Sequence, residues 1–169
     1  MPPLFCIAGY KNVGKTTLTE RLVREMTTRG LVVSTIKHAH HRVDIDQSGR
    51  DSHRHREAGA REVALVSGAR WAIMHELRGN EEPSLADIVG RLSPCDIVLT
   101  EGYKQDSYPK IEVRRSGIDR PALAGKDPSV VAIACDMEIP DATVPVLDMD
   151  DVGAIADFIL DHVGVEWRP

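Results

Sequence analysis

Short apolar runs alternate with helical patterns along this sequence. Leu18, Leu22 and Met26 recur on one face of a helical stretch, and Gly30 follows at the position expected for a C-terminal cap. The predicted helices cover residues 16–30, 51–60, 84–92 and 152–163. The predicted strands cover residues 4–9, 31–38, 62–68, 70–77, 96–102, 109–115, 130–136 and 143–151. This alternation is typical of an α/β protein.

Three of the apolar runs indicate how the sheet is built. Residues 31–38 close a strand–helix–strand unit of the length that a parallel crossover requires. Residues 96–102 are almost continuously apolar, which is typical of a strand covered on both faces. Residues 109–115 alternate in polarity and are predicted as an edge strand. We therefore predict a mostly parallel sheet with helices on both faces and an antiparallel edge extension, in a single domain over residues 1–169.

The segment GYKNVGKTT lies between the first predicted strand and the first predicted helix. It matches the phosphate-loop pattern G-x-x-x-x-G-K-[ST], whose glycines let the backbone turn its N–H groups towards a polyphosphate. Lys15 can reach the β- and γ-phosphates, and the Thr16 hydroxyl can bind Mg²⁺. The positive end of the helix adds to this attraction, and the motif predicts a P-loop NTPase-like fold. The predicted nucleotide-binding residues are Gly9, Tyr10, Lys11, Asn12, Val13, Gly14, Lys15, Thr16 and Thr17.

A second acidic ligand for the metal is expected at the end of a neighbouring strand. Asp96 and Glu101 lie at the two ends of the strand predicted over residues 96–102. In a parallel sheet the loops that follow the strands share one edge, so Glu101 falls beside the phosphate loop. Asp96 begins the strand and lies roughly 16 Å away at about 3.3 Å per residue. We therefore predict that Thr16 and Glu101 bind the metal, with Gly102 allowing close approach to a γ-phosphate.

The middle of the chain is rich in histidine, aspartate and arginine. Five of the seven histidines fall within 18 residues: His38, His40, His41, His53 and His55. Three interpretations remain open: contact with an anionic ligand or Mg²⁺, a transition-metal site, and a hydrated loop followed by a charged helix face. The candidate nucleotide or partner contacts in and beyond this segment are His41, Asp46, Asp51, Arg54, Gly102 and Lys104.

Composition narrows the classes of partner. The net charge of −5 argues against broad binding to nucleic acid or anionic lipid, and no apolar run approaches the length of a membrane span. The three cysteines, Cys6, Cys95 and Cys135, are widely separated and suit neither a disulfide framework nor a CxxC metal site. We expect buried thiols in a reducing cytoplasm, without nucleic-acid or membrane partners.

Four ordered motifs resemble one known family. The segments GYKNVGKTTL, TIKHAHH with DIDQSGRDSHRHREAGA, DIVLTEGYK and PKIEV are similar to those of the MobB family, the molybdopterin-guanine dinucleotide biosynthesis adapter proteins. The resemblance extends from about residue 4 to residue 159. It implies a dimeric GTP-binding protein that uses Mg²⁺ and works beside the molybdopterin guanylyltransferase, with molybdopterin as a further candidate partner. It also implies weak GTP hydrolysis and an accessory role.

Several parts of this interpretation stay open at the sequence level. The N-K-x-D element that recognises guanine in many GTP-binding proteins is missing here, and Asp127 and Asp136 are the candidates for base contact. The residues do not identify a catalytic base. Two alternative functions are a metal-delivery GTPase that uses the histidine-rich segment and a small-molecule kinase whose arginines at positions 50–61 form a substrate lid.

Overall fold

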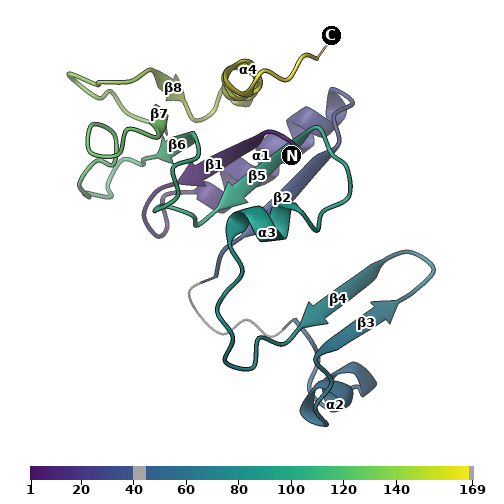
Figure 1. Ribbon diagram of the computed structural model, residues 1–169. Helices are drawn as coiled ribbons and strands as arrows, with labels where there is room; N and C mark the ends of the chain where they lie inside the picture. Colours follow the sequence, from purple (N-terminus) through teal and green to yellow (C-terminus); the bar gives the residue numbers. More distant parts are fainter. Residues whose placement is uncertain (40–44, 168–169) are drawn as a thin grey trace. The chain divides into compact units, whose positions relative to one another are not determined.

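The computed structural model describes residues 1–39 and 45–167 (Figure 1). Its contacts group into two compact units. One unit combines residues 1–38 with residues 89–169, and the other covers residues 39–88. The short helix α3 (Leu85–Val89) ends at the boundary between them. The single domain over residues 1–169 stays a prediction, because two compact units can belong to one domain or to two.

The larger unit contains a six-stranded sheet in which every pair of neighbours is parallel. Its strands are β1 (Leu4–Ala8), β2 (Val33–Lys37), β5 (Ile97–Glu101), β6 (Lys110–Val113), β7 (Val130–Cys135) and β8 (Val146–Asp148). The order across the sheet is β2-β5-β1-β6-β7-β8, so β1 lies between β5 and β6. This arrangement brings the carboxyl ends of all six strands to one edge, where ligands of open α/β sheets bind.

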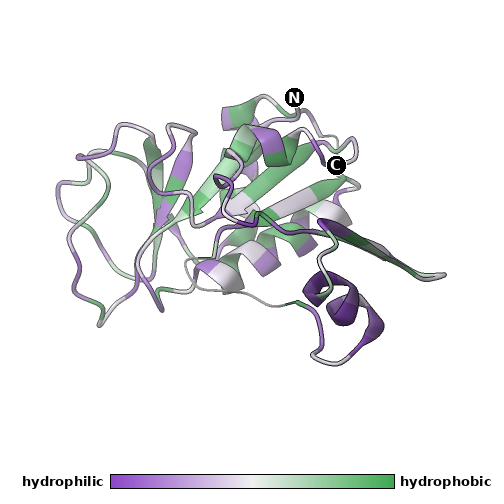
Figure 2. Ribbon diagram, turned by 60° about the horizontal axis from the view of Figure 1, so that its bottom comes forward, coloured by the Kyte–Doolittle hydropathy of each residue, from purple (hydrophilic) through white to green (hydrophobic). Residues whose placement is uncertain are grey.

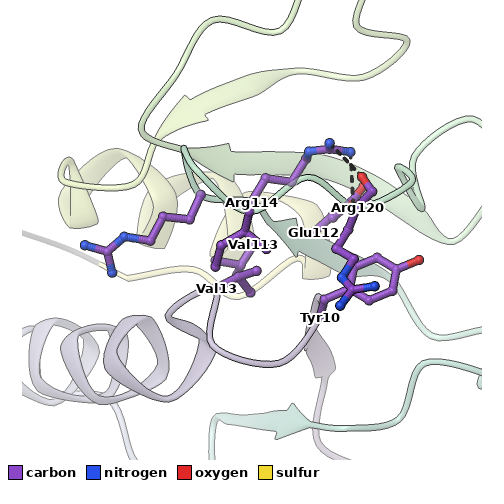
Figure 3. A pocket seen from close by; sticks show the side chains of 8 residues that line it. Tyr10, Val13, Glu112, Val113, Arg114 and Arg120 are labelled. Carbon is purple, nitrogen blue, oxygen red and sulfur yellow. Dashed lines mark hydrogen bonds and ion pairs between the residues drawn. The ribbon is translucent and has the colours of Figure 1, made fainter.

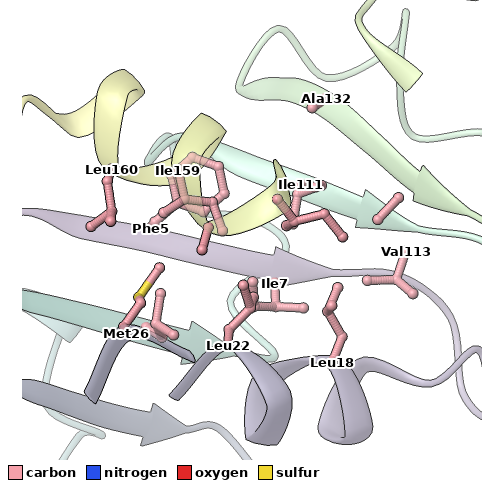
Figure 4. Packing of buried hydrophobic residues seen from close by; sticks show 14 of the residues in the cluster. Phe5, Ile7, Leu18, Leu22, Met26, Ile111, Val113, Ala132, Ile159 and Leu160 are labelled. Atoms are coloured by element: carbon pink, nitrogen blue, oxygen red, sulfur yellow. The ribbon is translucent and has the colours of Figure 1, made fainter. Parts of the chain in front are cut away.

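Helices α1 (Lys15–Thr28) and α4 (Val152–Val163) pack against each other and against β1. Leu18, Leu22 and Met26 of α1 are buried, as their helical spacing predicts. Ile159 of α4 packs in the same core as Phe5 of β1 (Figure 4). The aliphatic core therefore holds β1 and α1 in place, and with them the turn that joins the two elements.

Strand β6 occupies a different position from the one predicted. The alternating polarity of residues 109–115 indicated an edge strand, but β6 lies between β1 and β7 and all four of its residues are buried. Lys110 and Glu112 tolerate burial because each has a partner of opposite charge: Asp127 for Lys110 and Arg114 for Glu112. Lys110 Nζ donates to the carbonyls of Lys104 and Asp106 and to the Asp127 carboxylate. The edge-strand prediction was wrong because oxygens in the loops before and after β6 bind the Lys110 ammonium, so a charged side chain in this alternating pattern is buried and does not face solvent.

The smaller unit contains helix α2 (Asp51–Glu57) and an antiparallel hairpin, β3 (Glu62–Val66) and β4 (Trp71–His75). The hairpin forms a two-stranded sheet of its own and does not extend the six-stranded sheet. Hydrophilic residues dominate α2 (Figure 2). Arg56 of this helix connects the unit internally: its guanidinium lies 3.3 Å from Asp46 Oδ2 and 2.6 Å from Glu76 Oε1.

The α/β fold with a mostly parallel, P-loop NTPase-like sheet is confirmed. Among the described residues, no helix is both long enough and apolar enough to cross a membrane.

Candidate nucleotide-binding site

The phosphate loop follows β1 and ends where α1 begins at Lys15. Gly9 has a φ of +143°, and a Cβ at this position would lie 2.7 Å from the carbonyl oxygen of Val113. Asn12 and Gly14 also have positive φ, at 68° and 99°. Left-handed residues of this kind turn successive backbone N–H groups towards a common centre. Gly14 caps α1 without a side chain, so the first turn of the helix faces the loop with its N–H groups.

Lys15 extends from the first turn of α1 back across the loop. Its Nζ donates to the carbonyl of Tyr10 at 2.6 Å. Partial burial lowers the pKa of Lys15, and the nearby cations Lys104 and Lys37 act in the same direction, whereas Glu101 opposes the change. A partly desolvated ammonium with like-charged neighbours interacts favourably with an incoming anion, so these groups fit a polyphosphate.

Thr16 and Glu101 meet although they are 85 positions apart in sequence. The Thr16 hydroxyl lies 3.0 and 3.1 Å from the two carboxylate oxygens of Glu101, and Lys37 Nζ lies 3.6 Å from the same carboxylate. The register of the sheet explains this contact. Glu101 at the end of β5 lies beside Ile7 of β1 and Lys37 of β2, so it reaches the loop and helix that follow β1. Asp96, at the other end of β5, accepts a hydrogen bond from the backbone N–H of Val32 at 2.7 Å.

These two side chains fit a magnesium ion better than they fit a transition metal. Mg²⁺ is bound through one or two protein oxygens together with waters and substrate phosphates. Thr16 and Glu101 supply such oxygens beside the phosphate loop. In the described part of the chain, no group of three or more His, Cys, Asp or Glu side chains is arranged to hold a metal ion.

Gly102 and Lys104 follow β5 at the same edge of the sheet. Gly102 has a φ of +105°, and a Cβ there would lie 2.8 Å from the carbonyl oxygen of His38. Position 102 therefore requires glycine, because the backbone after β5 approaches the backbone after β2 too closely for a side chain. Lys104 Nζ lies 4.8 Å from the centre of the Tyr10 ring, which places this cation beside the phosphate loop.

The other predicted contacts from the histidine-rich segment belong to the smaller unit. His41 lies outside the described residues. Asp46 accepts hydrogen bonds from Ser52 and the backbone of Gln47 and pairs with Arg56. The bond from Ser52 is the largest of the effects that lower the pKa of Asp46. Asp46 therefore organises its own unit, which gives it a structural role whatever else it contacts.

Asp51 and Arg54 lie on α2, with their charged atoms 4.0 Å apart. Both side chains are largely exposed. They are therefore accessible to a ligand or partner.

The two aspartates proposed for base contact lie in different surroundings. Asp127 precedes β7 and accepts bonds from Lys110 Nζ, at 2.9 Å, and from Ser129. Burial raises the pKa of Asp127, but the bonds from Ser129 and Lys110 outweigh this and lower it. Asp136 follows β7 at the carboxyl edge, where its oxygens accept from the backbone N–H and the hydroxyl of Ser116. The Ser116 backbone bond is the main reason that the pKa of Asp136 is lowered.

A small pocket beside the phosphate loop contains residues that the sequence did not single out. It is lined by Tyr10 and Val13 of the loop and by side chains that follow β6, including Arg114 and Arg120 (Figure 3). Arg114 lies 3.6 Å from the buried Glu112 and donates to the carbonyl of Arg120. No sequence motif marks these arginines, because the pocket forms only when the β6–β7 loop folds back onto the phosphate loop.

Comparison with known proteins places the whole of this arrangement in one family. The family model described as "Molybdopterin guanine dinucleotide synthesis protein B", MobB, matches residues 4–136. The chain belongs to the MobB family. Its phosphate loop, Glu101 and the two buried charged residues Lys110 and Glu112 all lie within the matched region.

Individual MobB proteins resemble the chain over nearly its full length. A molybdopterin-guanine dinucleotide biosynthesis adapter protein of Escherichia coli (strain K12) is 38% identical over 99% of this chain and 94% of its own length. The corresponding adapter protein of Haemophilus influenzae is 40% identical over 93% and 87%. A crystal structure of molybdopterin-guanine biosynthesis protein B aligns with a TM-score of 0.74 at 26% identity, covering 95% of this chain and 99% of that chain.

Proposed function

We propose that this chain binds GTP with Mg²⁺ and acts as an adapter protein in the biosynthesis of molybdopterin guanine dinucleotide. The observation that carries the proposal is the contact of Thr16 with Glu101 beside the phosphate loop, across which Lys15 extends to the Tyr10 carbonyl. The adapter role is supported by relatives of that name at 38% and 40% identity over most of their length. The geometry supports a nucleotide, and the relatives support the pathway.

The nucleotide phosphates bind in the loop formed by residues 9–17. Backbone N–H groups and the amino end of α1 receive the phosphate oxygens. Lys15 exchanges the Tyr10 carbonyl for the β- and γ-phosphates, so its ammonium replaces a neutral acceptor with a charged one. Lys37 and Lys104 add positive charge at the same edge of the sheet.

Thr16 and Glu101 hold the magnesium ion. The oxygens of neighbouring ligands in an octahedral shell of radius 2.0–2.1 Å lie about 3 Å apart. The Thr16 hydroxyl and Glu101 Oε1 already lie 3.0 Å apart, so the pair needs little rearrangement to bind a shared ion or its bound water. When bound, Mg²⁺ neutralises charge on the β- and γ-phosphates.

Hydrolysis of GTP is weak in this proposal. Fast hydrolysis requires an oriented water and a group that stabilises charge on the γ-phosphoryl group. We assign no residue of the chain as catalytic base. The protein therefore holds the nucleotide and turns it over slowly. In this proposal it acts in the cytoplasm beside the molybdopterin guanylyltransferase, with molybdopterin as a further ligand. The exposed charges on α2, among them Asp51 and Arg54, are the surface proposed for these contacts.

We also propose that the protein is a homodimer joined through the hairpin of the smaller unit. Val66, Trp71 and Ile73 share one face of this hairpin and are each more than half exposed. A two-stranded sheet is marginally stable by itself, and an exposed apolar face of this kind is typical of an interface. A second copy of the chain would cover this face.

Replacement of Lys15 by alanine tests the nucleotide site. Titration with a fluorescent GTP analogue in Mg²⁺ should show an affinity loss of about 10- to 100-fold, because a charged hydrogen bond contributes roughly 1.5–3 kcal/mol. Arg24→Ala is the matched control, since Arg24 is an exposed cation of α1 that pairs only with Glu20 among the described contacts. Unchanged affinity in the Lys15 variant would contradict the assignment of the loop.

The adapter role needs a separate measurement. Calorimetric titration of the purified protein with the molybdopterin guanylyltransferase should give a defined stoichiometry, and GTP should bind more tightly than ATP. A protein that binds neither the enzyme nor molybdopterin, and does not distinguish GTP from ATP, would refute the proposal.

A further inference from the structure

Two loops from separate parts of the chain meet beside Gly14 of the phosphate loop. A Cβ on Gly14 would lie 3.7 Å from the methyl carbon of Met149 and 3.9 Å from Nη1 of Arg115. Arg115 lies in the loop after β6, and Met149 lies directly after β8. Two side chains therefore flank the last glycine of the phosphate loop, and neither belongs to the motif that identifies the loop.

Each of these side chains is held in place by a neighbour. Nε of Arg115 lies 3.8 Å from the Asp136 carboxylate, which is itself fixed by the backbone N–H and hydroxyl of Ser116. The carbonyl of Met149 accepts a bond of 3.1 Å from Arg21 of α1. Arg21 also donates to the carbonyl of Asp150 at 2.8 Å. The turn that carries Met149 is thus attached to the helix that begins at the phosphate loop.

The order of the strands places Arg115 and Met149 on the opposite side of β1 from Glu101, where the terminal phosphates and the metal are proposed to bind. Thr16 points towards Glu101, at the end of β5 on one side of β1. Arg115 and Met149 come from the loops after β6 and β8, on the other side of β1. A nucleotide whose terminal phosphates approach Glu101 therefore extends its nucleoside towards Arg115 and Met149.

The chemistry of the two side chains fits a flat aromatic group. A guanidinium plane stacks on an aromatic face, and a thioether makes favourable contacts with a ring. The Arg115 side chain is 56% exposed, which leaves its plane accessible. Met149 is half-buried and packs against the hydrophobic core, which holds its side chain in place.

We infer that the purine base of the bound nucleotide lies against Arg115 and Met149, next to Gly14. The inference rests on the proposed function, since it requires a nucleotide in the phosphate loop. Asp136 acts as a positioning residue that holds Arg115. Asp127 has a different task, because its carboxylate is the partner of the buried Lys110.

The test compares two ligands that share phosphates but differ in the base. GTP and inorganic tripolyphosphate, each with Mg²⁺, are titrated into the wild-type protein and into the variants Arg115→Ala and Met149→Ala. Both variants should bind GTP about tenfold more weakly, because stacking on a base commonly contributes this much. Their affinity for tripolyphosphate should be unchanged.

Further variants separate the possible explanations. Lys15→Ala should weaken binding of both ligands, and Arg24→Ala should weaken neither. Arg115→Lys keeps the charge but loses the plane, so it should resemble Arg115→Ala with GTP. Asp136→Asn should weaken GTP binding by a smaller factor and leave tripolyphosphate binding intact.

Two results would overturn the inference while leaving the phosphate site in place. One is an equal loss of affinity for GTP and for tripolyphosphate in Arg115→Ala. The other is a GTP affinity that stays at the wild-type value in Arg115→Ala, in Met149→Ala or in both. A wild-type protein that binds neither ligand would refute the proposed function and the inference with it. Thermal unfolding of each variant confirms that the comparison is made between folded proteins.

Discussion

Single residues determine how tightly the backbone closes around the phosphate loop. Gly9 touches the strand end at Val113, and Gly102 touches His38, at distances that exclude any side chain. Thr16 and Glu101 complete the same edge with two oxygens at hydrogen-bond distance. The site is therefore formed largely in advance, and substitutions of Gly9 and Glu101 test its backbone and its carboxylate separately.

Substitution of Glu101 by alanine should remove most of the dependence of binding on Mg²⁺. Affinity for GTP in Mg²⁺ should fall roughly tenfold, as expected for one lost charged ligand. Affinity in the presence of EDTA should stay the same or rise, because a carboxylate that repels phosphate is gone. Asp96→Ala is the control, since Asp96 lies at the far end of β5 and its loss should leave the Mg²⁺ dependence intact.

Gly9→Ala should destabilise the protein by about 2–4 kcal/mol, because it adds a backbone clash to the strain of positive φ. Gly30→Ala provides the comparison. Gly30 has a φ of +86° with no atom within 4 Å of the added Cβ, so its cost should be about 1 kcal/mol. Urea unfolding followed by circular dichroism measures both values. Equal costs for the two variants would show that the contact with Val113 is unimportant.

At the scale of elements, β6 connects the site to the rest of the sheet through buried charges. Lys110 is fully buried and bonded to three oxygens, and Glu112 accepts the backbone N–H groups of Leu123 and Ala124. These bonds fix the loops before and after β6. The pair formed by Lys110 and Asp127 makes this arrangement sensitive to acid.

Stability should therefore fall at low pH in a way that depends on Asp127. Burial raises the pKa of this carboxyl, but bonds from Ser129 and Lys110 lower it below the value in the unfolded chain. A lowered pKa contributes stability above the unfolded value of about 3.9, and this is lost as the pH falls through the folded value. Urea unfolding at pH 7 and at pH 3 should show a smaller difference for Asp127→Asn than for the wild type. Identical pH dependence would contradict the assigned pair.

The elements also show which parts of the structure the sequence could reveal. The phosphate loop, α1 and β5 were predicted because their signals are local: a spaced motif, a helical period and a continuous apolar run. The position of β6 was not, because the partners of Lys110 lie in loops that adopt their shape only in the folded protein. Arg115 and Met149 were not predicted for the same reason, since they approach Gly14 through two separate loops.

At the scale of the whole molecule, the proposed dimer depends on the hairpin of the smaller unit. Val66→Lys should place a charge in the proposed interface and shift the protein towards a monomer at micromolar concentration. Light scattering coupled to size-exclusion chromatography measures this mass. Val32→Lys is the matched control, because Val32 is also an exposed valine but lies in the larger unit. A wild-type monomer, or two variants that behave alike, would contradict the proposal.

The strand order also determines when the site can form as the chain leaves the ribosome. The phosphate loop comes before both β5 and β6 in the sequence, yet β1 lies between these two strands, which are completed only at Glu101 and Val113. Residues 39–88, which form the smaller compact unit, are synthesised in between. A nascent chain that ends before β6 lacks Val113, against which Gly9 packs, and a still shorter one lacks Glu101. Capture of the nucleotide therefore has to wait until Val113 has emerged, and a ligand bound at that moment would favour completion of the sheet.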